Sequence, residues 1–152
     1  MKTYVITLSE RFPIWHYLKG RPTHFVRSVE NGKKIHTIRA NYTEWERRFR
    51  KIERGEACLS LRRWEGTPYN SKQCEVMRLT REDGIGLERL RFANASVFKP
   101  VVSGCKLQYD RIAENDGLIP IDFIGWFRND DKTQDFAIIH FTAFRYSQAK
   151  ED

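Results

Sequence analysis

The stretch Phe136-Ala-Ile-Ile-His-Phe-Thr-Ala-Phe-Arg-Tyr146 decides the fold, because apolar side chains occupy both faces of a run that has strand periodicity. One face carries Phe136, Ile138 and Phe144, and the other carries Ala137, Ile139 and Phe141. A strand that is apolar on both faces is typical of the centre of a covered or closed sheet. Residues 136–146 are therefore predicted to form a central strand.

Working outward from this run, most other segments indicate short strands joined by turns. Alternation predicts strands at residues 2–9, 57–63 and 73–80, with weaker β-leaning segments at 85–92 and 95–102. Short helices are expected at 107–115 and from Pro120. Since strands outnumber helices, we predict a mainly β (α+β) domain over residues 1–146, a small barrel of about six strands with two or three helices. A polar tail at 147–152 follows it.

The strongest helical periodicity begins at Thr43. Apolar residues three or four positions apart mark the buried face: Tyr42, Trp45, Phe49 and Ile52. Thr43 and Glu46 match a capping box, and Gly55 supplies a stop. The outer face is basic and includes Arg47 and Arg50.

The composition is that of a globular protein. The 152 residues are 40% apolar and 13% aromatic, without an apolar segment after Met1 and without the run of roughly 18 apolar residues that a membrane span needs. We therefore expect a soluble, cytoplasmic protein that acts as a monomer and has no membrane partner. Three cysteines without a C-x-x-C pair and four histidines without metal-ligand spacing predict reduced thiols in the core, no metal and no other cofactor.

Positive charge is concentrated near the front of the chain. The net charge is +7, but residues 11–54 hold twelve Lys and Arg against four Asp and Glu, which gives +8. Such a surface attracts phosphates and other anions. The charge favours RNA or a nucleotide as the partner, although a basic face that confers only solubility explains it equally.

The octapeptide Gly32–Arg39 (GKKIHTIR) is the candidate for a chemical site. Strict alternation places Lys34 and His36 on one side of a strand, and Thr37 and Arg39 on the other. An irregular turn at Lys34 would instead let its ammonium converge with the Thr37 hydroxyl. A lysine beside a threonine can hold an anionic or carbonyl oxygen, or act as a base when burial lowers its pKa.

The fixed positions of this octapeptide resemble the G-x-K-x-x-T-I-R signature of ASCH domains, a branch of the PUA-like superfamily of small β-barrels. Further similarity follows in family order at residues 50–57, 113–118 and 136–144, so the resemblance covers residues 24–146. It implies a PUA-like barrel with a concave face beside the lysine motif, where RNA or a nucleotide binds.

The same resemblance implies a catalytic alternative. Some small ASCH proteins are amidohydrolases that remove the acyl group from N4-acetylcytidine with a lysine, a threonine and a glutamate. By motif position, the lysine and the threonine correspond to Lys34 and Thr37, and the glutamate corresponds to Asp116 or, failing that, to Glu114. Aspartate is a departure from this pattern, because its carboxylate sits one methylene closer to the backbone.

Three functions follow from these observations. The first is binding of RNA, a nucleotide or a nucleoside in a basic cleft, where aromatic side chains stack on bases. The candidate contacts are Gly32, Lys33, His36, Arg39, Arg47, Arg50, Trp64 and Tyr69. The second is an amidohydrolase with the catalytic residues Lys34, Thr37 and Asp116. The third is a non-catalytic module that binds a protein partner or DNA.

Overall fold

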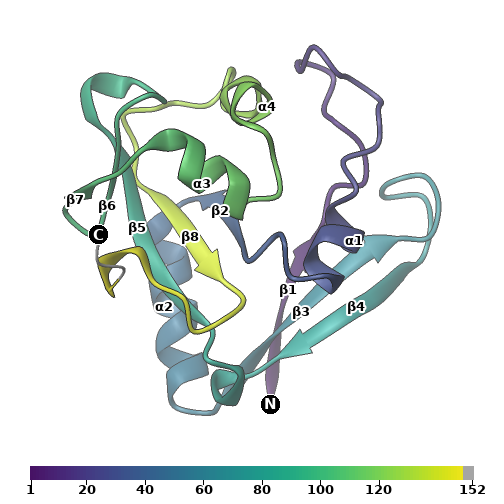
Figure 1. Cartoon of the computed structure of the whole chain (residues 1–152). Helices are drawn as coiled ribbons and strands as arrows, with labels where there is room; N and C mark the ends of the chain where they lie inside the picture. The colour runs from purple at the N-terminus through teal and green to yellow at the C-terminus, as the bar shows by residue number, and fades with distance from the viewer. Residues whose placement is uncertain (149–152) are drawn as a thin grey trace.

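A computed structural model describes residues 1–148, which form two β-sheets and four α-helices (Figure 1). The smaller sheet has the strand order β1–β3–β4, formed by Lys2–Thr7, Ala57–Trp64 and Gln73–Leu79. β1 runs parallel to β3, whereas β4 runs antiparallel to β3. The predicted strands at 2–9, 57–63 and 73–80 are therefore confirmed, with small shifts at their ends.

The larger sheet has the order β2–β8–β5–β6–β7 and is antiparallel throughout. Its strands are His36–Ala40, Phe136–His140, Gly86–Phe92, Pro100–Val102 and Cys105–Lys106. Every residue of β8 is buried, which confirms a central strand over 136–140, whereas the predicted continuation to 146 is wrong because residues 141–146 form no strand. The strand ends at His140, because its pairing with both β2 and β5 ends there.

Four helices flank the sheets: α1 (Phe25–Glu30), α2 (Tyr42–Glu53), α3 (Tyr109–Asn115) and α4 (Pro120–Trp126). α1 lies beside the smaller sheet near the loop that joins β3 to β4, while α3 and α4 lie together at one end of the larger sheet (Figure 1). α4 begins with Pro120 at its first position, as predicted. α1, which the sequence did not indicate as a helix, leads directly into the motif.

The helix α2 contacts β3, β5 and β8, so it packs against strands of both sheets. Trp45, Phe49 and Ile52 are buried on its inner face, as the periodicity predicts. The predicted capping box is wrong, because the N-cap is Asn41, two residues before Thr43. Asn41 has a left-handed conformation and makes no side-chain cap. The stop at Gly55 is confirmed by its φ of 76°.

The predicted barrel is not confirmed, because the strands of residues 1–148 form two separate sheets and no closed barrel is found. The molecule is a mixed α+β fold that is mostly β. The expected strand at 95–102 is shortened to Pro100–Val102, since Asn94 and Ala95 take positive φ angles that break a strand. No helix among residues 1–148 is long and apolar enough to cross a membrane. Residues 149–152 of the predicted tail lie outside the described residues.

The three cysteines are free, but they do not share one environment. Cys58 is buried, as expected of a core thiol, whereas Cys74 is half-buried and Cys105 is exposed. The expectation of three core thiols is therefore wrong for Cys105. Its position explains this, because the two-residue strand β7 is exposed at the edge of the larger sheet.

Candidate functional site

The motif adopts an irregular turn between α1 and β2. The backbone amides of Lys33 and Lys34 both donate to the Ser28 carbonyl at 2.9 Å, which folds the chain back on α1. The amide of Ile35 donates to the Asn115 carbonyl at 2.9 Å and ties the turn to the end of α3. Regular strand pairing starts only at His36, so Lys34 lies outside the strand and its side chain need not alternate with that of Thr37. The two side chains thus line one cavity, as expected for an irregular turn at Lys34.

Lys34 forms a buried ion pair with Asp116. Its Nζ lies 3.0 Å from Asp116 Oδ1 and 2.7 Å from the Asp116 backbone carbonyl, and it sits 4.1 Å from the centre of the Phe25 ring. Burial lowers the pKa of Lys34, while the Asp116 charge opposes that shift. Burial alone raises the pKa of Asp116, but the charge of Lys34 and the hydrogen bond from His36 outweigh it, so the net shift is downward.

A hydrogen-bond chain behind the ion pair fixes the Asp116 carboxylate. Asn115 Nδ2 donates to the Tyr146 hydroxyl at 3.0 Å, so the hydroxyl proton is free to go to His36 Nε2, 2.7 Å away. His36 then carries its proton on Nδ1 and donates it to Asp116 Oδ1 at 3.3 Å. In this chain His36 is a buried donor that orients the carboxylate toward Lys34.

The ion pair lies at the wall of a small cavity of about 90 Å³. Its polar lining includes Lys34, Thr37, Arg39 and Asp116, and its apolar lining includes Leu8, Phe25, Trp126 and Phe127. Arg39 Nη2 donates to the Thr7 carbonyl at 2.9 Å, but its Nε is buried without a hydrogen-bond partner among residues 1–148. Burial lowers the pKa of Arg39, although a guanidinium keeps its charge at any physiological pH.

This inner cavity adjoins an outer cavity of about 280 Å³, with which it shares Leu8, Ser9 and Arg39. Trp64 and Tyr69 line the outer cavity, and their ring centres lie 5.2 Å apart. Tyr69 is 87% exposed and has a φ of 65° in the loop between β3 and β4. An open groove of about 820 Å³ continues from there between α1 and the same loop.

We call the inner and outer cavities together the cleft. Only some of the predicted contact residues line it. Arg39, Trp64 and Tyr69 line it, together with the three proposed catalytic residues. Gly32 and Lys33 are exposed on the turn and line none of these cavities, while His36 is fully buried behind Asp116. Sequence reasoning missed the lining residues Leu8 and Trp126, which come from distant segments that carry no local signal.

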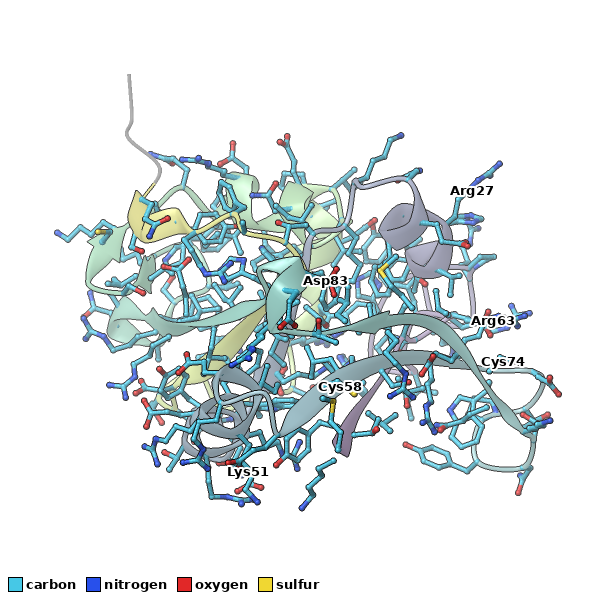
Figure 2. All side chains as sticks on the ribbon, turned by 90° about the horizontal axis from the view of Figure 1, so that it is seen from below. Arg27, Lys51, Cys58, Arg63, Cys74 and Asp83 are labelled. Atoms are coloured by element: carbon cyan, nitrogen blue, oxygen red, sulfur yellow. The ribbon has the colours of Figure 1, made fainter. Side chains whose placement is uncertain are left out.

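The basic face of α2 is separate from the cleft. Arg47 pairs with Glu44, and Arg50 Nη2 lies 3.1 Å from Glu46 Oε1, so both charges are matched within the helix. Figure 2 shows α2, marked by Lys51, well away from α1, which is marked by Arg27. Arg27 belongs to the groove beside α1, so the basic segment divides between two surfaces.

The choice between the two acidic candidates follows from their positions. Asp116 is buried against Lys34, whereas Glu114 is exposed on α3. The shorter aspartate still reaches Lys34, because Asp116 directly follows α3 and its backbone carbonyl also accepts from Lys34 Nζ.

Among residues 1–148, no group of three or more His, Cys, Asp or Glu is arranged to hold a metal ion. Comparisons with known protein families, curated proteins and solved structures find no match to this chain.

Proposed function

We propose that this chain is an ASCH-type, PUA-like domain that binds RNA or a nucleotide in the cleft beside the lysine motif. The observation that carries the proposal is the continuity of two unlike cavities. A polar inner cavity with Lys34 and Arg39 opens into an outer cavity with Trp64 and Tyr69. A nucleotide unit requires the same pairing, since its base stacks on aromatic rings while its polar groups need charged donors.

The electrostatic balance of the cleft supports an anionic ligand. Lys34 and Asp116 neutralise each other across 3.0 Å, and Arg39 forms no salt bridge with a described residue. The inner cavity therefore carries one positive charge without a protein counter-ion. A half-buried cation without a counter-ion is costly to stability, so its presence supports a role in binding.

The test is a fluorescence titration of a labelled single-stranded RNA with wild-type protein at 50, 100 and 200 mM salt. The affinity should fall steeply as salt is added, because phosphate contacts release counterions. Trp64→Ala should weaken binding by about tenfold, in line with the loss of one stacked base. Phe98→Ala removes another exposed aromatic, 56% exposed and away from these cavities, and should leave the affinity unchanged. Absence of RNA and nucleotide binding would contradict the proposal.

A second candidate function is the hydrolysis of an amide such as that of N4-acetylcytidine. The observation that favours it is that Lys34, Thr37 and Asp116 line one small cavity. The Lys34 ammonium can donate to the carbonyl oxygen while the Thr37 oxygen attacks the carbonyl carbon and forms an ester. Asp116 takes the proton of the Thr37 hydroxyl and passes it to the amine as the C–N bond breaks. Water then hydrolyses the ester to the acid and restores the Thr37 hydroxyl.

Incubation with N4-acetylcytidine followed by chromatography tests this candidate. Turnover by the wild type that is lost in Thr37→Val would support the nucleophile. The exposed Thr67→Val change is the matched control, since Thr67 lies in the loop outside the inner cavity. No turnover by the wild type would contradict catalysis on this substrate and would leave the binding proposal intact.

A further inference from the structure

Resting on the proposed function, we propose that the cleft takes a phosphorylated nucleotide unit in one orientation: the phosphate on Arg39 and the base on the Trp64–Tyr69 pair. This orientation leaves Lys34 outside the phosphate contact. Three independent observations support it, namely the size of the inner cavity, the unmatched donors of Arg39 and the exposure of the aromatic pair.

The size of the inner cavity excludes a base. Its volume is about 90 Å³, whereas an engineered protein cavity that holds a benzene ring measures about 150 Å³. The outer cavity, at about 280 Å³, has room for a heterocycle. A flat ring therefore fits against Trp64 and Tyr69, and only a small polar group enters beside Thr37.

Arg39 is the group best placed for the phosphate. Its side chain lines both cavities, so it stands where a base in the outer cavity and a small group in the inner cavity would be joined. Of the five N–H donors of the guanidinium, the structure pairs one Nη2 donor with the Thr7 carbonyl and leaves Nε unpaired. Guanidinium groups bind phosphate oxygens through pairs of parallel hydrogen bonds.

Lys34 is a poorer partner for a phosphate, although its charge first suggests one. Its ammonium already donates to the Asp116 carboxylate and to the Asp116 carbonyl. A phosphate placed on Lys34 would also approach the Asp116 carboxylate and be repelled by it. The negative charge of the ligand is therefore directed to Arg39.

The aromatic pair is built for contact with a ligand rather than for the core. Tyr69 is 87% exposed and its backbone is held in a left-handed conformation that non-glycine residues rarely adopt. Gly66 and Pro68 of the same loop line the outer cavity and the open groove alike. The groove itself has mixed charge, since Arg11 and Arg27 lie there together with Glu10, Glu30 and Glu65.

The experiment compares adenosine, adenosine 5′-monophosphate, inorganic phosphate and hexa-adenylate by calorimetric titration at 50 mM salt. Wild-type protein should bind the monophosphate at least about tenfold more tightly than adenosine, the effect of one charge-assisted pair. Arg39→Gln should abolish this ratio, because it removes the phosphate contact. Trp64→Ala should weaken adenosine and the monophosphate by the same factor, about tenfold.

Arg54→Gln is the matched control, because it removes one exposed arginine that is paired with Glu56 and lies outside the cleft. The ratio should persist in this variant. If Arg39→Gln does not fold, the phosphorus resonance of the monophosphate gives a second test, since it should shift when wild-type protein is added. Tighter binding of hexa-adenylate than of the monophosphate assigns the phosphate to an RNA strand, and equal binding assigns it to a free nucleotide.

Two results would overturn this orientation. One is equal affinity of wild-type protein for adenosine and its monophosphate, and the other is a phosphate preference that survives in Arg39→Gln. In both cases adenosine still binds, so the proposed function stands while the orientation fails. If none of the four ligands binds, the proposed function itself is wrong.

Discussion

The Asp116 carboxylate has two donors on a single oxygen, since Lys34 Nζ lies 3.0 Å and His36 Nδ1 lies 3.3 Å from Oδ1. Because both donors are buried, water cannot replace Asp116 as their hydrogen-bond acceptor. The carboxylate therefore serves the fold and the site together: it compensates the ammonium and it fixes the tautomer of the histidine.

This dual role predicts a large cost for Asp116→Asn. The change leaves a buried ammonium without a counter-ion, and we expect the free energy of unfolding to fall by about 3 kcal/mol. Urea denaturation at pH 7 measures the change. Glu114→Gln removes the same charge from an exposed position two residues away, and should cost less than about 0.5 kcal/mol. Similar losses in the two variants would show that the ion pair does not stabilise the protein.

A second residue-scale prediction concerns Gly117, whose φ is +81° and whose added Cβ would lie 3.1 Å from Lys34 Cβ. Gly117→Ala therefore combines backbone strain with pressure on the lysine. Gly104 has a φ of +82° with nothing within 4 Å of an added Cβ, so Gly104→Ala isolates the strain. We expect losses of about 2 kcal/mol at Gly117 and about 1 kcal/mol at Gly104 in thermal unfolding. Equal losses would mean that the Lys34 side chain moves aside at no cost in stability.

Among the elements, the short 3₁₀ helix Tyr146–Gln148 ties the end of the described chain to the site. The Tyr146 hydroxyl joins it to His36 on β2 and to Asn115 on α3. Removal of the hydroxyl therefore leaves His36 Nε2 without its hydrogen-bond partner, while Asp116 still holds Nδ1. Burial raises the pKa of Tyr146, so this hydroxyl keeps its proton at neutral pH.

Tyr146→Phe should lower the free energy of unfolding by about 1–2 kcal/mol, because it leaves buried polar groups unpaired. Nitrogen NMR of His36 should show a changed Nε2 resonance, because Nε2 loses its hydrogen-bond partner while Nδ1 keeps its contact with Asp116. Tyr109→Phe is the control, since the half-buried Tyr109 hydroxyl makes no hydrogen bond to the described residues. An unchanged His36 spectrum in Tyr146→Phe would refute the direction assigned to the hydrogen-bond chain.

The elements also show how far the sequence predicts this molecule. α2 and β8 are predictable, because a helical period and a two-faced apolar strand are local patterns. The parallel pairing of β1 with β3 is not, since alternation names a buried face and never a partner strand. For that reason the sequence suggests a barrel where the structure has two sheets.

The candidate site, like the fold, is only partly predictable from the sequence. Lys34, Thr37 and Asp116 follow from the motif and its resemblance, and the structure brings them to one cavity. His36 does not line the cleft because it is fully buried, and the α2 arginines do not because they pair with Glu44 and Glu46 on a separate face. Neither fact can be predicted from the spacing of charges in the sequence. The apolar wall supplied by Trp126 arises only from tertiary packing.

At the scale of the whole molecule, Glu88 connects the larger sheet to the chain end. Its carboxylate accepts from His140 Nε2 at 2.9 Å, from the Tyr146 amide at 2.6 Å and from the Ser103 hydroxyl at 3.0 Å. Burial alone raises the pKa of Glu88, but these hydrogen bonds outweigh it and lower the pKa to about 2. Burial also lowers the pKa of His140.

These shifts predict a protein that loses stability in acid. The unfolded chain takes up the Glu88 proton near the ordinary value of 4.5, whereas the folded protein does so only near 2, so the contribution of Glu88 is complete above pH 4.5 and disappears toward pH 2. The neutral His140 acts in the same direction from higher pH. Thermal unfolding from pH 7 to pH 2 should show the decline, and Glu88→Gln should flatten it below pH 4.5. A variant with an unchanged slope would contradict this assignment.

The pairing of β2 with β8 has a consequence for biosynthesis. Residues 36–40 are synthesised before residues 136–140, which form their one partner strand among residues 1–148, and one edge of β5 also waits for that strand. Until residues 136–140 are made, a nascent chain has two unpaired strand edges, one at β2 and one at β5. Thr37 of the cleft then lacks its pairing with Ile139. Such long-range closure makes folding slow relative to local helix formation. The cleft thus matures only after residues 136–140 have been made, and until then the open strand edges expose a growing chain to misassociation.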